Sequence, residues 1–74
     1  MSWRGTVMVP GRRLHVGATP AGRCSVWHYV DGAPVVLARG RVRGMVELYA
    51  LELVHGTEAD ADVLRRWLKE RITT

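Results

Sequence analysis

Three histidines and one cysteine are the side chains of this sequence best suited to bind a metal ion or to move a proton. His15, His28 and His55 show no HxxxH spacing, and Cys24 has no CxxC partner. A zinc site takes three or four nitrogen or sulfur ligands in tetrahedral reach. The spacing gives no reason to expect such a site, and the sequence names no partner that would make His28 a general base. We therefore expect no metal and no cofactor.

The acids and the glycines also have structural explanations. Glu58, Asp60 and Asp62 are spaced like paired carboxylates, but they fall in the first turn of an expected helix, where acids cap the backbone and suit the helix dipole. The eight glycines are dispersed, without the lysine and hydroxyl of a phosphate-binding loop. Ser2 and Ser25 occupy no nucleophile elbow. The sequence predicts a protein that is not an enzyme.

Arginine supplies the most distinctive surface pattern. Of eleven basic residues only Lys69 is lysine, and Arg39, Arg41 and Arg43 alternate along an expected strand. Alternate strand residues lie on one face about 6.6 Å apart, so these side chains would form a basic ridge. Such a ridge has three open interpretations: a solvated strand face, a protein contact, or a nucleic-acid contact. In the third, aromatic side chains would stack on bases, and the candidates are Trp27 and Tyr29.

These side chains are positioned by strands separated by turn signals. Pro10-Gly11 suits a type II turn and Asp31-Gly32 a hairpin turn. Strands are expected at about 5–9, 12–18, 24–30, 34–42 and 46–55, followed by a helix at about 58–73.

The segment 46–55 fits either a helix or a strand, and we favour a strand. As a helix it would place glutamates on its leucine side, which spoils its amphipathicity. As a strand it would follow a three-residue loop, Arg43-Gly44-Met45. The expected register then pairs Val42 with Val46, Arg41 with Glu47, Arg39 with Tyr49 and Leu37 with Leu51.

The C-terminal helix has clear sequence signals. Thr57 is a good N-cap, with Asp60 three residues later. An apolar stripe recurs at spacings of three and four residues: Ala61, Leu64, Trp67, Leu68 and Ile72. We therefore predict an α+β fold, an antiparallel meander of about five strands followed by one helix, as an open sheet or a partly closed barrel.

The helix is expected to cover one sheet face and to leave the other apolar. The residues expected on this reverse face are Val35, Leu37, Tyr49, Leu51 and Leu53. A solvated monomer rarely exposes so much apolar surface. Barrel closure, a homodimer partner or a target protein would each cover it.

The chain has 74 residues and is expected to form one domain, 1–74. Its start lacks the apolar core of a signal peptide, and its longest apolar stretch is too short to span a bilayer. Cys24 alone cannot form an internal disulfide and is best explained as a small buried hydrophobe. We expect a cytoplasmic protein without membrane contact.

These observations predict a small binding protein. The leading hypothesis is an adaptor or inhibitor of a larger protein or nucleoprotein complex, such as a phage or mobile-element anti-defence protein of the anti-CRISPR type. The alternative is a basic nucleic-acid-binding domain that uses the arginine ridge. The net charge of +4 permits an anionic partner. The candidate contact residues are Arg39, Arg41, Arg43, Trp27, Tyr29, Tyr49, Leu37 and Leu51.

Overall fold

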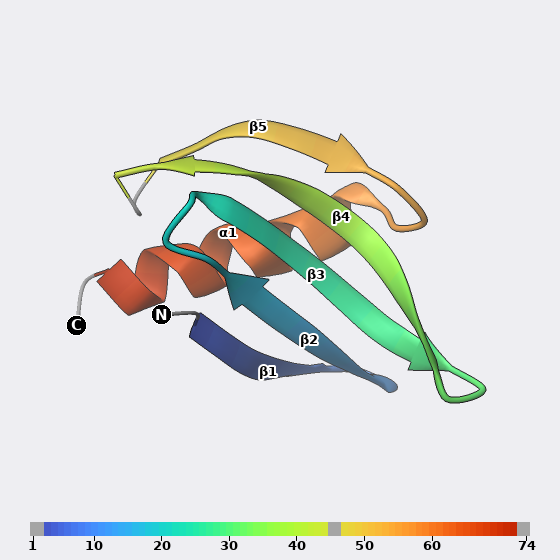
Figure 1. Cartoon of the computed structure of the whole chain (residues 1–74). Coiled ribbons are helices and arrows are strands. Elements are labelled where there is room, and N and C mark those ends of the chain that lie inside the picture. The colour runs from blue at the N-terminus through green and yellow to red at the C-terminus, as the bar shows by residue number, and fades with distance from the viewer. Residues whose placement is uncertain (1–2, 45–46, 73–74) are drawn as a thin grey trace.

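The computed structural model describes residues 3–44 and 47–72. Its elements are β1 (Trp3–Val9), β2 (Arg12–Ala18), β3 (Arg23–Val30), β4 (Ala33–Arg43), β5 (Glu47–Leu53) and α1 (Glu58–Ile72). The strands form one open antiparallel sheet in the order β1-β2-β3-β4-β5, and α1 runs across one of its faces (Figure 1). The predicted α+β meander is confirmed, in its open-sheet form. Met45, Val46 and Thr73, which the prediction placed in a loop, a strand and a helix, lie outside the described residues.

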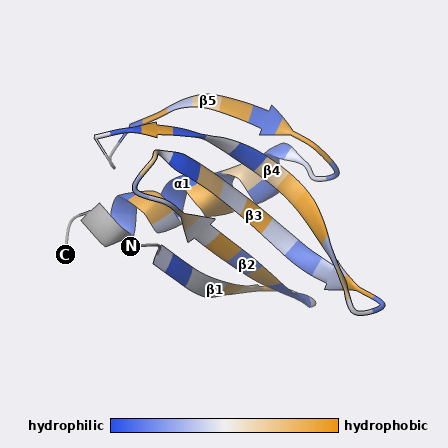
Figure 2. Ribbon diagram, in the orientation of Figure 1, coloured by the Kyte–Doolittle hydropathy of each residue, from blue (hydrophilic) through white to orange (hydrophobic). Residues whose placement is uncertain are grey.

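The core lies between the sheet and α1 because apolar residues alternate along the strands. Leu14 and Val16 on β2 and Val26 on β3 are fully buried, and hydrophobic and hydrophilic residues alternate along these strands (Figure 2). Each such side chain contributes about 1.5–3 kcal/mol when it leaves water. The helix supplies the other half of the core from its predicted stripe, together with Val63. Its buried apolar residues are Ala61, Val63, Leu64, Trp67 and Leu68.

The start of α1 is capped as the sequence predicts. The backbone N–H of Thr57 donates to Oδ2 of Asp60 at 2.9 Å, and the N–H of Asp60 donates to the carbonyl of Thr57 at 3.0 Å. Asp60 is only 5% exposed, and its Oδ1 lies 3.3 Å from Nη1 of Arg12 at the start of β2. This carboxylate therefore fixes the start of the helix and ties it to the sheet.

The loop between β2 and β3 depends on one glycine. Gly22 has φ of +86°, and a Cβ there would lie 2.7 Å from the carbonyl oxygen of Val42. The carbonyl of Gly22 accepts a hydrogen bond from the N–H of Val42 at 2.7 Å. Only glycine permits this backbone approach, which attaches the loop to β4.

Two register shifts interrupt the sheet, and both involve β4. Val26 pairs with Ala38 but Trp27 pairs with Val36, so Leu37 is an extra residue in β4. Such a bulge interrupts the alternation of faces. Leu37 and Ala38 are both buried, at 2% and 0% exposure.

The second shift lies between β4 and β5. Arg41 pairs with Ala50 and Val42 with Leu48, which leaves Tyr49 as the extra residue. The predicted β4–β5 register is therefore wrong. Arg41 faces Ala50 instead of Glu47, and Arg39 faces Glu52 instead of Tyr49. The strand nature of β5 is confirmed.

The prediction of an apolar reverse face is also wrong. Leu37 belongs to the core, and Leu51 packs against the core because it pairs with Gly40 on the helix side. Leu53 pairs with Ala38, a core residue, although it remains 41% exposed. The two bulges are the physical reason, because each moves the residues beyond it to the other face.

Candidate nucleic-acid interface

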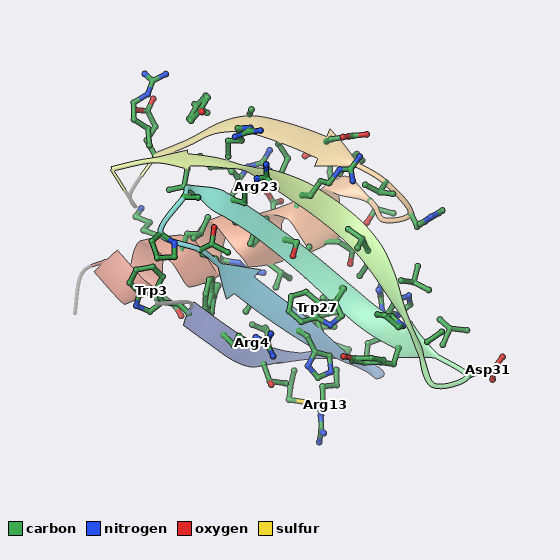
Figure 3. The ribbon with its side chains drawn as sticks, viewed as in Figure 1. Trp3, Arg4, Arg13, Arg23, Trp27 and Asp31 are labelled. Carbon is green, nitrogen blue, oxygen red and sulfur yellow. The ribbon has the colours of Figure 1, made fainter. Side chains whose placement is uncertain are left out.

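The sheet face that α1 leaves uncovered is basic and aromatic. Its side chains alternate with core residues along the strands, as Arg13, His15 and Gly17 do with Leu14, Val16 and Ala18 on β2. Arg4, Arg13, Arg23 and Trp27 come from three different strands and project from this face (Figure 3). The arginines and aromatic residues of the uncovered face include Arg4, Arg13, Arg23, Arg39, Arg41, His15, Trp27 and Tyr29.

Most of these arginines have no acidic partner. Arg39 is the exception, because its Nε lies 3.0 Å from Oε2 of Glu52 on β5. Within residues 3–44 and 47–70, the side chains of the other four make no ion pair or hydrogen bond: Arg4, Arg13, Arg23 and Arg41. Their charge is therefore available to an anion from solution.

Two of the unpaired arginines are directly opposite each other. Arg23 on β3 pairs with Arg41 on β4, and both are exposed. Like charges at directly opposite positions destabilise a ladder by a few tenths of a kcal/mol. On its other side Arg41 faces Ala50, which gives no compensation. A phosphate between the two guanidinium groups would replace this repulsion with charge-assisted hydrogen bonds.

The charges of the chain are also segregated along its length. The first acid in the sequence is Asp31, so residues 1–30 contain four arginines and no acid. Residues 1–46 carry a net charge of +6, and residues 47–74 carry −2. Because β1 to β4 fall in the first part, the sheet holds the positive charge of the molecule.

An aromatic cluster lies on the uncovered face across β2 and β3. The rings of His15 and Trp27 are 5.8 Å apart at an interplanar angle of 20°, and Tyr29 meets His15 edge-on at 5.0 Å. Gly17 leaves room for this arrangement. A Cβ on Gly17 would lie 3.3 Å from two atoms of the Trp27 ring, so that ring extends over β2.

A hollow of about 730 Å³ lies beside this cluster. Small residues line part of it, including Gly17, Ser25 and Ala50. The larger side chains that line it include five from the three strands β1, β3 and β4: Arg4, Arg23, Trp27, Arg39 and Arg41. The hollow thus joins an aromatic ring to unpaired guanidinium groups, and its volume is in the range of small-molecule pockets.

The structure brings together only part of the predicted contact set. Trp27, Arg39 and Arg41 line the hollow, and Tyr29 belongs to the adjoining aromatic cluster. Arg43 and Tyr49 lie near the end of the β4–β5 pair, where the guanidinium stacks 4.5 Å above the ring. Of the two predicted leucine contacts, Leu37 belongs to the core, whereas Leu51 packs against the core and also borders the hollow.

Sequence reasoning missed four members of the uncovered face: Arg4, Arg13, Arg23 and His15. The sequence does contain a pattern that indicates their position. Arg23, Ser25, Trp27 and Tyr29 occupy alternate positions in β3, so they had to share a face. Residues 1–30 also carry four positive charges without one negative charge.

Cys24 lies on the opposite side of the sheet, in the core. Its side chain is 5% exposed, which confirms the expectation of a buried hydrophobe, and burial raises the pKa of the thiol from 9.0 to about 11. In the described part of the chain, no three His, Cys, Asp or Glu side chains come together as metal ligands would. Among the same residues, no helix has the length and apolar character required to cross a bilayer.

Comparisons with protein-family models, curated proteins and solved structures found no match for this chain.

Proposed function

We propose that this protein is a non-enzymatic binding protein whose uncovered sheet face binds nucleic acid. The observation that carries the proposal is a set of four arginines on that face that have no ion pair or hydrogen bond within residues 3–44 and 47–70, and two of them, Arg23 and Arg41, are directly opposite each other. Guanidinium groups match phosphate geometry and keep their charge at every physiological pH. Phosphate contacts supply most of the affinity of proteins for nucleic acid at low salt.

We thus favour the nucleic-acid-binding domain, the alternative hypothesis from the sequence, over the adaptor or inhibitor. The leading hypothesis is an adaptor or inhibitor, such as an anti-CRISPR-type protein, that docks on a protein or nucleoprotein complex through one sheet face, the apolar reverse face, and the exposed side of the helix. The uncovered face carries Arg4, Arg13, Arg23 and Arg41 without acidic partners instead. Protein interfaces have apolar, charge-depleted centres, whereas nucleic-acid interfaces are strongly positive. The charge of this face therefore supports nucleic acid as the occupant.

The test is a double substitution, Arg23→Gln with Arg41→Gln, measured by fluorescence anisotropy with a labelled oligonucleotide of about 12 nucleotides at low salt, a length within the range of known single-strand sites. We expect the Kd to rise by at least about tenfold, equal to about 1.4 kcal/mol. The same variant should keep its melting temperature or gain about 2 °C, because the opposed charges are removed. Weaker binding with an undiminished Tm separates a functional role from a structural one.

The matched control is Arg65→Gln with Arg66→Gln on the exposed side of α1, which lowers the net charge by the same amount. We expect its affinity for the oligonucleotide to stay within about twofold of the wild type, because α1 lies on the other side of the sheet. Equal losses of affinity in both double variants would show that binding depends on the net charge of the protein and not on the uncovered face. Failure of the wild-type protein to bind any oligonucleotide at low salt would overturn the proposal and favour an acidic protein surface as the partner.

A further inference from the structure

The uncovered face has a feature that phosphate binding does not require, the aromatic cluster beside the hollow. Trp27 and His15 lie nearly parallel, with ring centres 5.8 Å apart. The Trp27 ring extends over Gly17 and borders the hollow, although a polar side chain would serve a purely electrostatic surface equally well. An aromatic ring on a solvated face next to unpaired arginines offers a surface on which a planar group can stack.

The sheet is too wide to enter the major groove of a duplex. Five strands spaced about 4.8 Å apart are about 19 Å wide, whereas the major groove of B-DNA is about 12 Å wide and admits one helix or a two-stranded ribbon. Bases paired inside that groove would stay out of reach of Trp27. An unpaired strand can turn its bases toward the sheet.

The spacing of aromatic and basic side chains suits a strand that lies along β3. Arg23, Ser25, Trp27 and Tyr29 share the uncovered face of β3, and four residues of strand separate Trp27 from Arg23 by about 13 Å. Arg41 lies opposite Arg23, and the hollow extends from this pair to Trp27. A base on Trp27 and a phosphate between the two arginines can therefore belong to the same ligand.

Building on the proposed function, we propose that the hollow is a base-stacking subsite and that the ligand class is single-stranded nucleic acid. One unpaired base stacks on Trp27, next to His15, while the backbone of the strand passes between Arg23 and Arg41. Stacking of this kind tolerates every base, because each base has a π-face. The protein accordingly binds single strands with little sequence preference.

The test compares three probes of about 12 nucleotides within the range of known single-strand site sizes: an unstructured DNA strand, the same sequence as RNA, and the DNA duplex. We expect both single strands to bind more tightly than the duplex and to quench tryptophan fluorescence. Trp27→Leu should raise the Kd for the single strands by about tenfold and leave the Kd for the duplex unchanged. It should also leave the salt dependence unchanged, because no phosphate contact is lost.

Two further variants keep the outcome interpretable. Trp27→Phe retains an aromatic face, so we expect it to keep most of the wild-type affinity for single strands. It can be compared with the wild type even if Trp27→Leu folds poorly. Tyr49→Leu removes an exposed aromatic ring outside the hollow and should have no effect. A duplex that binds as tightly as the single strands, with Trp27→Leu as active as the wild type, would overturn the stacking subsite but leave the phosphate-binding function intact. Absence of binding to all three probes would overturn both.

Discussion

The two faces of this sheet differ in how far they expose an ionisable group to water, as Cys24 and the Arg23–Arg41 pair show. On the core side the thiol of Cys24 is buried, and loss of its solvation raises its pKa to about 11. On the other side two guanidinium groups remain in water, and the sheet tolerates their repulsion. Burial of an ionisable group has consequences for stability, whereas exposure of a charged pair has consequences for binding.

The raised pKa of Cys24 predicts a pH dependence of stability. Because the thiol ionises at a higher pH in the folded chain than in the unfolded chain, its contribution is complete below about pH 9 and is lost as the pH rises toward 11. We expect the wild-type Tm to fall more steeply over this range than the Tm of Cys24→Ala. Thermal unfolding followed by circular dichroism at intervals between these pH values measures the difference. Parallel curves for the two proteins would contradict it.

At the scale of elements, local sequence sets the start of α1 and the turn between β3 and β4, while it does not set the faces of β4 and β5. Thr57 with Asp60 and the Asp31-Gly32 turn each act over a few residues, so the sequence predicts them. A bulge has no such local signature. Val35 to Ala38 are four apolar residues in succession, and nothing in that run indicates that Leu37 is the extra one.

The same contrast explains which contact residues could be predicted. On β1, β2 and β3 the alternation is unbroken, so Arg4, Arg13 and Arg23 could have been placed on one face by counting. On β4 and β5 each bulge reverses the count, which put Leu37 and Leu51 on the wrong side. Arg39 and Arg41 were placed together because they lie in the same unbulged stretch of β4.

The start of α1 supports a prediction at this scale. Asp60→Ala removes the acceptor for the Thr57 N–H and leaves Arg12 without its partner, so we expect a loss of about 2 kcal/mol and a fall in Tm of about 10 °C. Thermal denaturation measures the change. Asp62→Ala is the control, because Asp62 is exposed and, among the residues that the structure describes, its ion pair is with Arg65 in the same helix. If both variants melted alike, the buried carboxylate would have no special part in docking the helix.

At the scale of the whole molecule, the segregation of charge predicts the salt dependence of binding. For single strands the slope of log K against log salt is about −0.7 for each phosphate neutralised. With four unpaired arginines on the uncovered face, we expect a slope of about −3. Arg23→Gln with Arg41→Gln should reduce it to about −1.4, while Arg65→Gln with Arg66→Gln should leave it unchanged. Anisotropy titrations at several salt concentrations supply these slopes, and a slope near zero for the wild type would argue against phosphate contacts.

The acid-free first thirty residues have one more consequence. Residues 1–46 carry a net charge of +6, whereas α1 contains four acidic and four basic residues and is neutral overall, so the sheet is the positive side of the molecule. The field of a polyanion exerts a torque on a molecule charged in this way, and the torque turns the sheet toward the ligand before the two surfaces touch. Fewer encounters are then spent in the wrong orientation, and the advantage fades as added ions shorten the range of the field.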